Sequence, residues 1–81
     1  MKQLEKDITT ATDREYLIEL DKYLDKDIIN VNEEVNKVVI MHTQKFSEEQ
    51  YQSRKKQQID YFNKLKNLIS ERLKELTHTQ L

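Results

Sequence analysis

Apolar residues recur every three or four positions through the first half of the chain. The series runs through Leu17, Leu20, Leu24, Ile28, Val31, Val35 and Val38. A spacing that averages about 3.5 residues places such side chains on one face of a helix, whereas a half-buried strand alternates every second residue. The pattern therefore predicts a long helix from about residue 13 to residue 42. The β-branched run from Val35 to Ile40 leaves a strand there as an alternative.

A second apolar series begins after a short polar break. Its members are Ile59, Phe62, Leu65, Ile69, Leu73 and Leu76, with Tyr61 and Leu68 beside them. Helix-start signals precede it, because Ser47 and Gln50 have the spacing of a capping box, and Phe46 and Tyr51 have that of a hydrophobic staple. The sequence therefore predicts a second helix over residues 48–76.

The two ends of the chain carry weaker signals. Thr12 and Glu15 have capping-box spacing and mark the start of the first long helix. Upstream, threonines around residue 10 disfavour a continuous helix, so we expect residues 1–11 to form a weakly ordered arm. A short N-terminal helical arm is the alternative, because a helical spacing relates Met1, Leu4 and Ile8. Residues 77–81 carry no cap signal and are also expected to be weakly ordered.

Composition and charge favour an all-helical fold. The 81 residues include no glycine and no proline, the residues that usually end helices and turn hairpins. A connection as short as residues 42–45 usually makes consecutive helices antiparallel neighbours. Residues 13–34 carry eight acids and three bases, whereas residues 48–76 carry seven bases and five acids, which favours their pairing. We predict one all-α domain over residues 1–81, an antiparallel two-helix hairpin.

This hairpin leaves apolar side chains without a partner at its loop end. The first helix is apolar there, whereas residues 52–58 of the second are entirely polar. Either the aliphatic stems of Arg54, Lys55 and Lys56 cover the apolar residues, or another protein does, as is typical of a contiguous apolar patch. We predict the second case, with a partner-binding surface made of Val31, Val35, Val38, Val39, Ile40, Met41 and Tyr51.

The sequence contains no catalytic or metal-binding pattern. Cysteine is absent, and His42 and His78 lie on separate segments, so thiolate and imidazole ligands do not cluster. Acids that share a helix face, such as Asp21 and Asp25, lack a pocket that would raise the pKa of one of them. We therefore expect no enzymatic activity, no cofactor and no bound metal.

Nucleic acids and membranes are disfavoured as partners. The basic residues Arg54, Lys55 and Lys56 are able to contact phosphate, but a net charge of -1 and an acidic first helix oppose binding to nucleic acid. No stretch reaches the roughly 18 apolar residues of a membrane span, and the first seven residues carry charges in place of the apolar core of a signal peptide. The expected location is the cytoplasm.

The opening of the second helix, Ser47-Glu-Glu-Gln50-Tyr51-Gln52, resembles that of the small needle-subunit co-chaperones of bacterial type III secretion systems. Leu4-Glu5 near the start and the long first helix agree with the resemblance. The segment 54–58 is more basic than the second helix of that family, whose loop often contains a glycine. The resemblance implies a short cytoplasmic helical hairpin that joins a second, repeat-type helical chaperone and keeps a needle subunit soluble.

Two functions fit these predictions. One is a non-enzymatic chaperone or adaptor that binds another helical protein through the apolar residues at the loop end. The other is a regulatory or structural protein that self-associates into a homodimeric four-helix bundle and buries the same residues against its own copy. The two differ in what covers the valine-rich segment.

Overall fold

The structure is all-helical. The computed structural model describes residues 2–79, and in that range it contains four helices and no strand. The helices are α1 (Lys2–Thr10), α2 (Arg14–Asn32), α3 (Lys37–Gln44) and α4 (Glu48–Thr79). The predicted all-α class is confirmed, and the alternative of a strand between Val35 and Ile40 is wrong. The long helix predicted over residues 13–42 is divided into α2 and α3.

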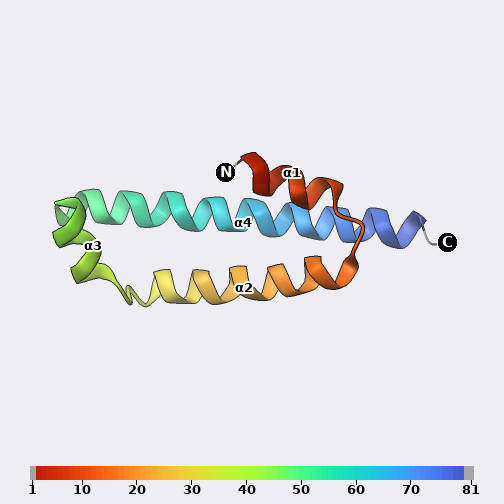
Figure 1. Ribbon diagram of the computed structural model, residues 1–81. Coiled ribbons are helices and arrows are strands. Elements are labelled where there is room, and N and C mark those ends of the chain that lie inside the picture. Colours follow the sequence, from red (N-terminus) through yellow and green to blue (C-terminus); the bar gives the residue numbers. More distant parts are fainter. Residues whose placement is uncertain (1, 80–81) are drawn as a thin grey trace.

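Helix α4 is the spine of an elongated molecule (Figure 1). Helix α2 runs antiparallel to α4, α1 lies along the C-terminal half of α4, and α3 lies across its N-terminal end (Figure 1). The molecule measures 52 × 20 × 15 Å. Its longest dimension agrees with the length of α4, because an α-helix of 32 residues spans roughly 48 Å. Helices α2 and α4 are therefore the antiparallel neighbours that the sequence predicts. The described residues form four helices, however, whereas the prediction was a two-helix hairpin.

The hydrophobic core lies where α1, α2 and α4 meet. Leu17 and Leu24 lie seven positions apart on one face of α2, and Leu65 and Ile69 lie four apart on one face of α4. Burial of these side chains removes the most apolar surface from water and holds the three helices together. The core consists of Ile8, Leu17, Leu24, Leu65 and Ile69, and among the residues packed around it are Leu4, Leu20, Phe62, Leu68, Leu73 and Leu76.

The N-terminal segment corrects a prediction. Residues 1–11 were expected to form a weakly ordered arm, but residues 2–10 form α1 and the Ile8 side chain is fully buried. Just past the helix, the backbone carbonyl of Ala11 accepts a hydrogen bond from Arg72 Nε at 2.7 Å. Packing against α4 thus offsets the low helix propensity of the threonine-rich stretch. The alternative of a short N-terminal helix is the one observed.

Helix α2 has a different cap from the predicted one. The sequence places Thr12 and Glu15 in a capping box, but Asp13 is the N-cap residue. Its Oδ1 accepts hydrogen bonds from the backbone N–H groups of Glu15 at 3.0 Å and Tyr16 at 3.4 Å. A carboxylate also complements the positive end of the helix dipole, an interaction that a threonine hydroxyl lacks. The predicted start of the helix is nevertheless correct to within one residue.

Helix α4 begins where its capping box predicts. The Ser47 N–H donates to Gln50 Oε1 at 2.9 Å, and the Gln50 N–H donates to Ser47 Oγ at 3.2 Å, so both halves of the box form. The helix extends to Thr79 and thus passes the predicted end at residue 76. Of the predicted weakly ordered end, residues 77–79 are helical, and Gln80 and Leu81 lie outside the described residues.

A turn at residues 33–36 interrupts the long first helix. Glu34 has a φ of 55°, a left-handed conformation that is uncommon for a residue other than glycine or asparagine. The Val35 N–H donates to the Asn30 carbonyl, and the Glu34 N–H donates to the Val31 carbonyl. These are the two hydrogen bonds of a Schellman motif, which ends α2 here without a glycine. The prediction of a continuous helix to residue 42 is wrong because the apolar spacing on which it was based continues across this turn.

Helix α3 ends in a similar way. Lys45 has a φ of 56°, and the Phe46 N–H donates to the Met41 carbonyl at 3.0 Å, as in a second Schellman motif. His42 and its two successors, predicted to lie in the connection, therefore belong to α3. The connection to α4 consists of residues 45–47.

Candidate protein-binding surface

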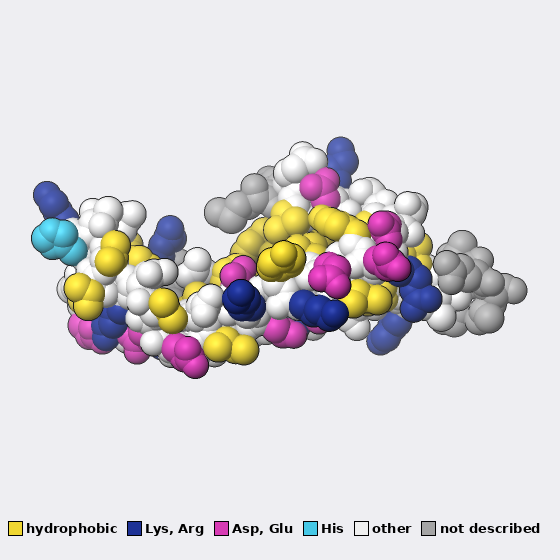
Figure 2. All heavy atoms as spheres, turned by 60° about the horizontal axis from the view of Figure 1, so that its bottom comes forward, with side chains coloured by type: hydrophobic (Ala, Val, Ile, Leu, Met, Phe, Trp, Pro, Cys, Tyr) yellow, Lys and Arg dark blue, Asp and Glu magenta, His cyan; other side chains and the backbone are white. Residues whose placement is uncertain are grey.

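The end of the molecule opposite the core carries exposed apolar side chains. Val38, Val39 and Val35 are 80%, 65% and 59% exposed, and Ile40 is 37% exposed. Val31 and Met41 are half-buried, whereas Tyr51 is buried. Figure 2 shows apolar side chains on the surface at this end of the molecule. We define the loop-end surface as the predicted set Val31, Val35, Val38, Val39, Ile40, Met41 and Tyr51.

The turn after α2 is what exposes these side chains. It redirects the chain so that α3 crosses the start of α4 in place of continuing along it (Figure 1). With only eight residues, α3 covers little of α4, and none of its residues is buried. In a helix, Val38 and Val39 lie about 100° apart, so Val38 and Val39 present one broad apolar face to solvent.

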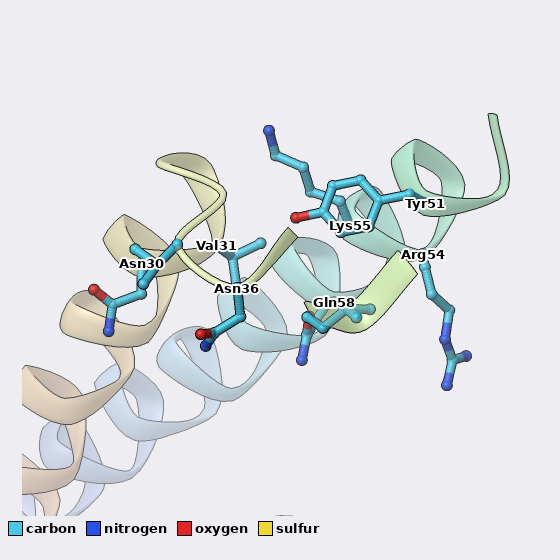
Figure 3. Close-up of a pocket in the computed structure, with 9 residues that line it drawn as sticks. Asn30, Val31, Asn36, Tyr51, Arg54, Lys55 and Gln58 are labelled. Carbon is cyan, nitrogen blue, oxygen red and sulfur yellow. The ribbon is translucent and has the colours of Figure 1, made fainter. Parts of the chain in front are cut away.

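A cavity of about 100 Å³ lies between the end of α2, the turn, α3 and the start of α4. It brings together four of the predicted residues, Val31, Val35, Ile40 and Tyr51, while Val38, Val39 and Met41 do not line it. Figure 3 shows the lining residues that come from the two long helices and the turn. The exposed valines of α3 therefore stand next to a cavity that the same segment helps to form.

The polar lining of this cavity was not predicted from the sequence. It consists of Asn30, Asn36, Arg54, Lys55 and Gln58. The asparagines carried a usable signal, since three of them fall within seven residues around the turn, and asparagine favours turns over helix interiors. The residues from α4 could not be assigned, because only the position of α3 brings them to a cavity.

Lys37 links the turn to the start of α4. Its Nζ lies 3.1 Å from Glu34 Oε2 and 2.7 Å from Glu48 Oε1, and it stands 5.4 Å from the centre of the Tyr51 ring. Lys55 Nζ lies 3.5 Å from the other oxygen of Glu34. A residue with a strained backbone is thus held by two cations from two helices, which opposes unwinding of the turn.

The same contacts shift the pKa values of the three linked groups. The hydrogen bond from Lys37 lowers the pKa of Glu34 and of Glu48 below the ordinary value of 4.5. In return, hydrogen bonds to Glu48 and then Glu34 raise the pKa of Lys37 above its ordinary value of 10.5. All three groups are therefore charged throughout the neutral range, which keeps the ion pairs intact there.

Lysine and arginine stems do not cover the valines. This alternative required Arg54, Lys55 and Lys56 to lie over them, but Val35, Val38 and Val39 all remain more than half exposed. Lys55 instead pairs with Glu34, and Arg54 and Lys55 extend from α4 in opposite directions (Figure 3). The apolar face of α3 is therefore open to solvent.

Among the described residues, no group of three or more His, Cys, Asp or Glu side chains is placed so that it could hold a metal ion. His42 is exposed on α3, and the side chain of His78 lies outside the described residues. Asp21 and Asp25 both pair with Lys66, whose pKa the hydrogen bond to Asp25 raises. These two acids therefore serve as an anchor between α2 and α4.

Comparison with known proteins does not assign a family. The chain matches no family model, no curated protein and no solved structure. The resemblance to type III secretion co-chaperones thus stays a prediction. Among the described helices, none combines the length and the apolar character needed to cross a membrane.

Proposed function

We propose that this protein is a non-enzymatic chaperone or adaptor that binds another helical protein through the loop-end surface. The observation that carries the proposal is the 80% and 65% exposure of Val38 and Val39 on a helix next to an apolar-lined cavity. Burial of a valine side chain contributes about 1.5 kcal/mol or more. Contiguous exposed apolar side chains rimmed by polar groups are typical of interaction sites.

The surface is suited to a helical partner because exposed apolar side chains of α3 lie beside a cavity. An amphipathic helix binds apolar surfaces through side chains three or four positions apart. Lys37 and Glu34 hold the turn that presents the surface, so binding requires little ordering of this chain. A preformed surface loses less conformational entropy on association and binds more tightly for the same contacts.

The narrower role that the resemblance implies is part of this proposal. In that role the protein acts in the cytoplasm with a second, repeat-type helical chaperone and keeps a secretion needle subunit soluble. Its support is the Ser47–Gln52 opening of α4. Co-purification with a helical-repeat protein through the loop-end surface is the result that this role requires.

Site-specific photo-crosslinking in the cells that produce the protein tests the proposal. A photoreactive residue is placed at Val38 or Val39, and a third variant carries it at Asn67, an exposed residue in the C-terminal half of α4. We expect both α3 positions, but not Asn67, to crosslink to the same helical protein. That protein, once purified, should bind the wild-type chain, and Val38→Asp should weaken binding more than about tenfold because it buries an unpaired charge.

Two results contradict the proposal. If both α3 positions crosslink only to a second copy of the chain, the alternative of a homodimeric regulator or structural protein replaces it. If crosslinking at Val38 and Val39 does not exceed that at Asn67, neither function uses the loop-end surface.

A further inference from the structure

Helix α1 covers only part of the length of α4. Glu5 pairs with Lys64 at 3.1 Å, and the Ala11 carbonyl accepts a hydrogen bond from Arg72 at 2.7 Å, so α1 runs beside the C-terminal half of α4. Along the N-terminal half, the part of the chain that the structure describes has no helix in the corresponding place (Figure 1). Figure 2 shows the outline of the molecule dipping between α1 and the α3 end.

The cavity at the loop end lies on the same side of α4 as the core that α1 helps to bury. An α-helix completes about five turns in 18 residues, so side chains that far apart on α4 point to the same side. Tyr51 stands 18 positions before Ile69, a core residue, and Arg54 stands 18 positions before Arg72, which binds the end of α1. Because Tyr51 and Arg54 line the cavity, it opens on the side of α4 that α1 covers farther along.

The size and apolar lining of the cavity suit a single aliphatic side chain. A cavity of about 150 Å³ is able to hold a benzene molecule, and this one measures about 100 Å³. Val31 and Tyr51 contribute apolar lining, and Val31 lies seven positions after Leu24, on the core face of α2. An apolar side chain in the cavity would therefore extend the row that Ile8 of α1 joins at the core.

The charge around the cavity favours a partner with a carboxylate. Lys55 is paired with Glu34, but Arg54 forms no ion pair with any described residue. Helix α1 shows how α4 is covered elsewhere, since it buries Ile8 and pairs Glu5 with Lys64 on α4. A second helix of the same kind, with an apolar anchor and an acid beside it, would complement the open part.

We propose that the partner's helix lies along α4 end to end with α1, inserts one aliphatic side chain into the cavity and sets a carboxylate against Arg54. This inference rests on the proposed function and adds the seat of the partner and its chemistry, an acidic amphipathic helix. It places the binding helix on the N-terminal half of α4, next to the exposed face of α3, so that Val38 and Val39 contact its outer side.

Two peptides added to the isotopically labelled full chain test the inference by nuclear magnetic resonance. Both copy residues 1–12, with blocked ends, and retain Leu4 and Ile8. The acidic peptide carries Lys2→Glu and Lys6→Glu, and the basic peptide carries Glu5→Lys and Asp7→Lys. We expect the acidic peptide to shift the amide signals of Val31, Tyr51 and Gln58, and to bind at least about threefold more tightly than the basic one.

Variants of the full chain test whether the acidic peptide contacts Arg54. Arg54→Glu should weaken binding of the acidic peptide about three- to tenfold. Lys56→Glu is the matched control, because it makes the same charge change two positions away on a different side of α4 and does not line the cavity. Binding of the acidic peptide should be nearly unchanged in this control. Equal losses in the two variants contradict a specific contact at Arg54.

Two other outcomes overturn the inference. Signal changes at Lys64 and Leu68 in place of Tyr51 and Gln58 mean that the peptide exchanges with α1. No signal change up to about 1 mM peptide, a concentration that detects weak complexes, means that this part of α4 binds no such helix. If Val38 still crosslinks to a helical protein in either case, the seat is refuted and the proposed function stands. If Val38 also no longer crosslinks to a helical protein, both this inference and the proposed function are refuted.

Discussion

The two ends of this molecule share the helix α4 but differ in what covers it. At one end α1 and α2 flank α4 and bury Ile8, Leu17 and Leu65 completely or nearly so. At the other end α3 covers α4 in part, and Tyr51 is buried while Val38 is 80% exposed. The difference shows that an apolar stripe is not enough for a core, because burial requires a third helix on the remaining side.

The two ends also differ in the interactions that hold them. Apolar packing dominates the core end, where Lys66 and its two aspartates add a bridge between α2 and α4. At the loop end, the main interactions are the ion pairs of Lys37 with Glu34 and Glu48. Ion pairs on a surface contribute little to stability compared with apolar burial. The core end should therefore set global stability, and the loop end should respond first to changes in charge.

Truncation of a core side chain should lower the free energy of unfolding more than any change at the loop end. Leu65→Ala leaves a cavity among three helices and should lower the free energy of unfolding by about 2–5 kcal/mol. Val38→Ala removes an exposed side chain and should change it by less than about 0.5 kcal/mol. Urea unfolding followed by circular dichroism measures both. Similar losses would mean that the valines of α3 belong to a core that the two ends share.

Loss of the α1 anchor should have the next largest effect. Ile8→Ala should lower the free energy of unfolding by about 2 kcal/mol, at the lower end of the range for buried isoleucines, because a short terminal helix is able to detach locally. Hydrogen exchange should accelerate throughout residues 2–10. Thr9→Ala, at an exposed neighbouring position, is the control and should leave the exchange of these amides nearly unchanged. Unchanged exchange in Ile8→Ala would contradict a packed α1.

Removal of the α4 cap should have a moderate effect that starts at the loop end. Ser47→Ala loses the hydrogen bond from the Gln50 N–H and should cost about 1 kcal/mol. Ser53→Ala is the control, because Ser53 is exposed within the same helix and alanine is the better helix former. Thermal unfolding of the two variants compares them. A Ser47→Ala variant as stable as the wild type would show that α3 alone positions the start of α4.

Acid should loosen the loop end before the core end. Because Lys37 lowers the pKa of Glu34 and of Glu48, their stabilising effect is complete above the ordinary value of 4.5 and is lost as the pH falls through the lowered values. Amide protection in residues 37–44, which is the exchange rate corrected for its intrinsic dependence on pH, is followed by nuclear magnetic resonance from pH 7 to pH 3. It should be lost at a higher pH than protection around Leu65. Lys37→Gln should reduce this difference. A simultaneous loss of protection at both ends in the wild type would contradict it.

Charges on the exposed face of α3 should have the smallest effect on folding. The double variant Val38→Asp/Val39→Asp should change the free energy of unfolding by less than about 0.5 kcal/mol, because both side chains are more than 60% exposed in the isolated chain. The same variant should no longer bind the helical protein that crosslinks to Val38 and Val39. If it unfolds as readily as Leu65→Ala, the loop-end surface is part of the core, and the proposed function is wrong.

Much of the fold could be predicted from local rules. The Ser47 capping box placed the start of α4, and the heptad-like spacing of Leu17 and Leu24 placed their face toward Leu65. These signals work because capping and helical periodicity involve residues close in sequence. The apolar spacing misled at the turn after α2, because it continues past Glu34, whose left-handed conformation ends the helix.

The candidate surface was predicted in part for the same reason. Val35 and Val38 were identified as surplus because the facing segment of α4 contains no apolar side chain apart from Tyr51 to meet them. Their arrangement could not be predicted, because it depends on the turn at Glu34 and on the direction that α3 takes from it. Arg54 was known as a basic residue but not as part of a cavity, since a cavity exists only where separate helices meet.

By itself, the sequence determined an all-helical chain, the start of its longest helix and the face of each long helix that is apolar, since these follow from backbone propensity, capping and period. Tertiary structure alone decided that Ile8 is core and that Val38 is surface. The cause is a contact far apart in sequence: α1 packs on residues near Arg72 and covers one end of α4. The other end is left for α3, which is too short to bury it.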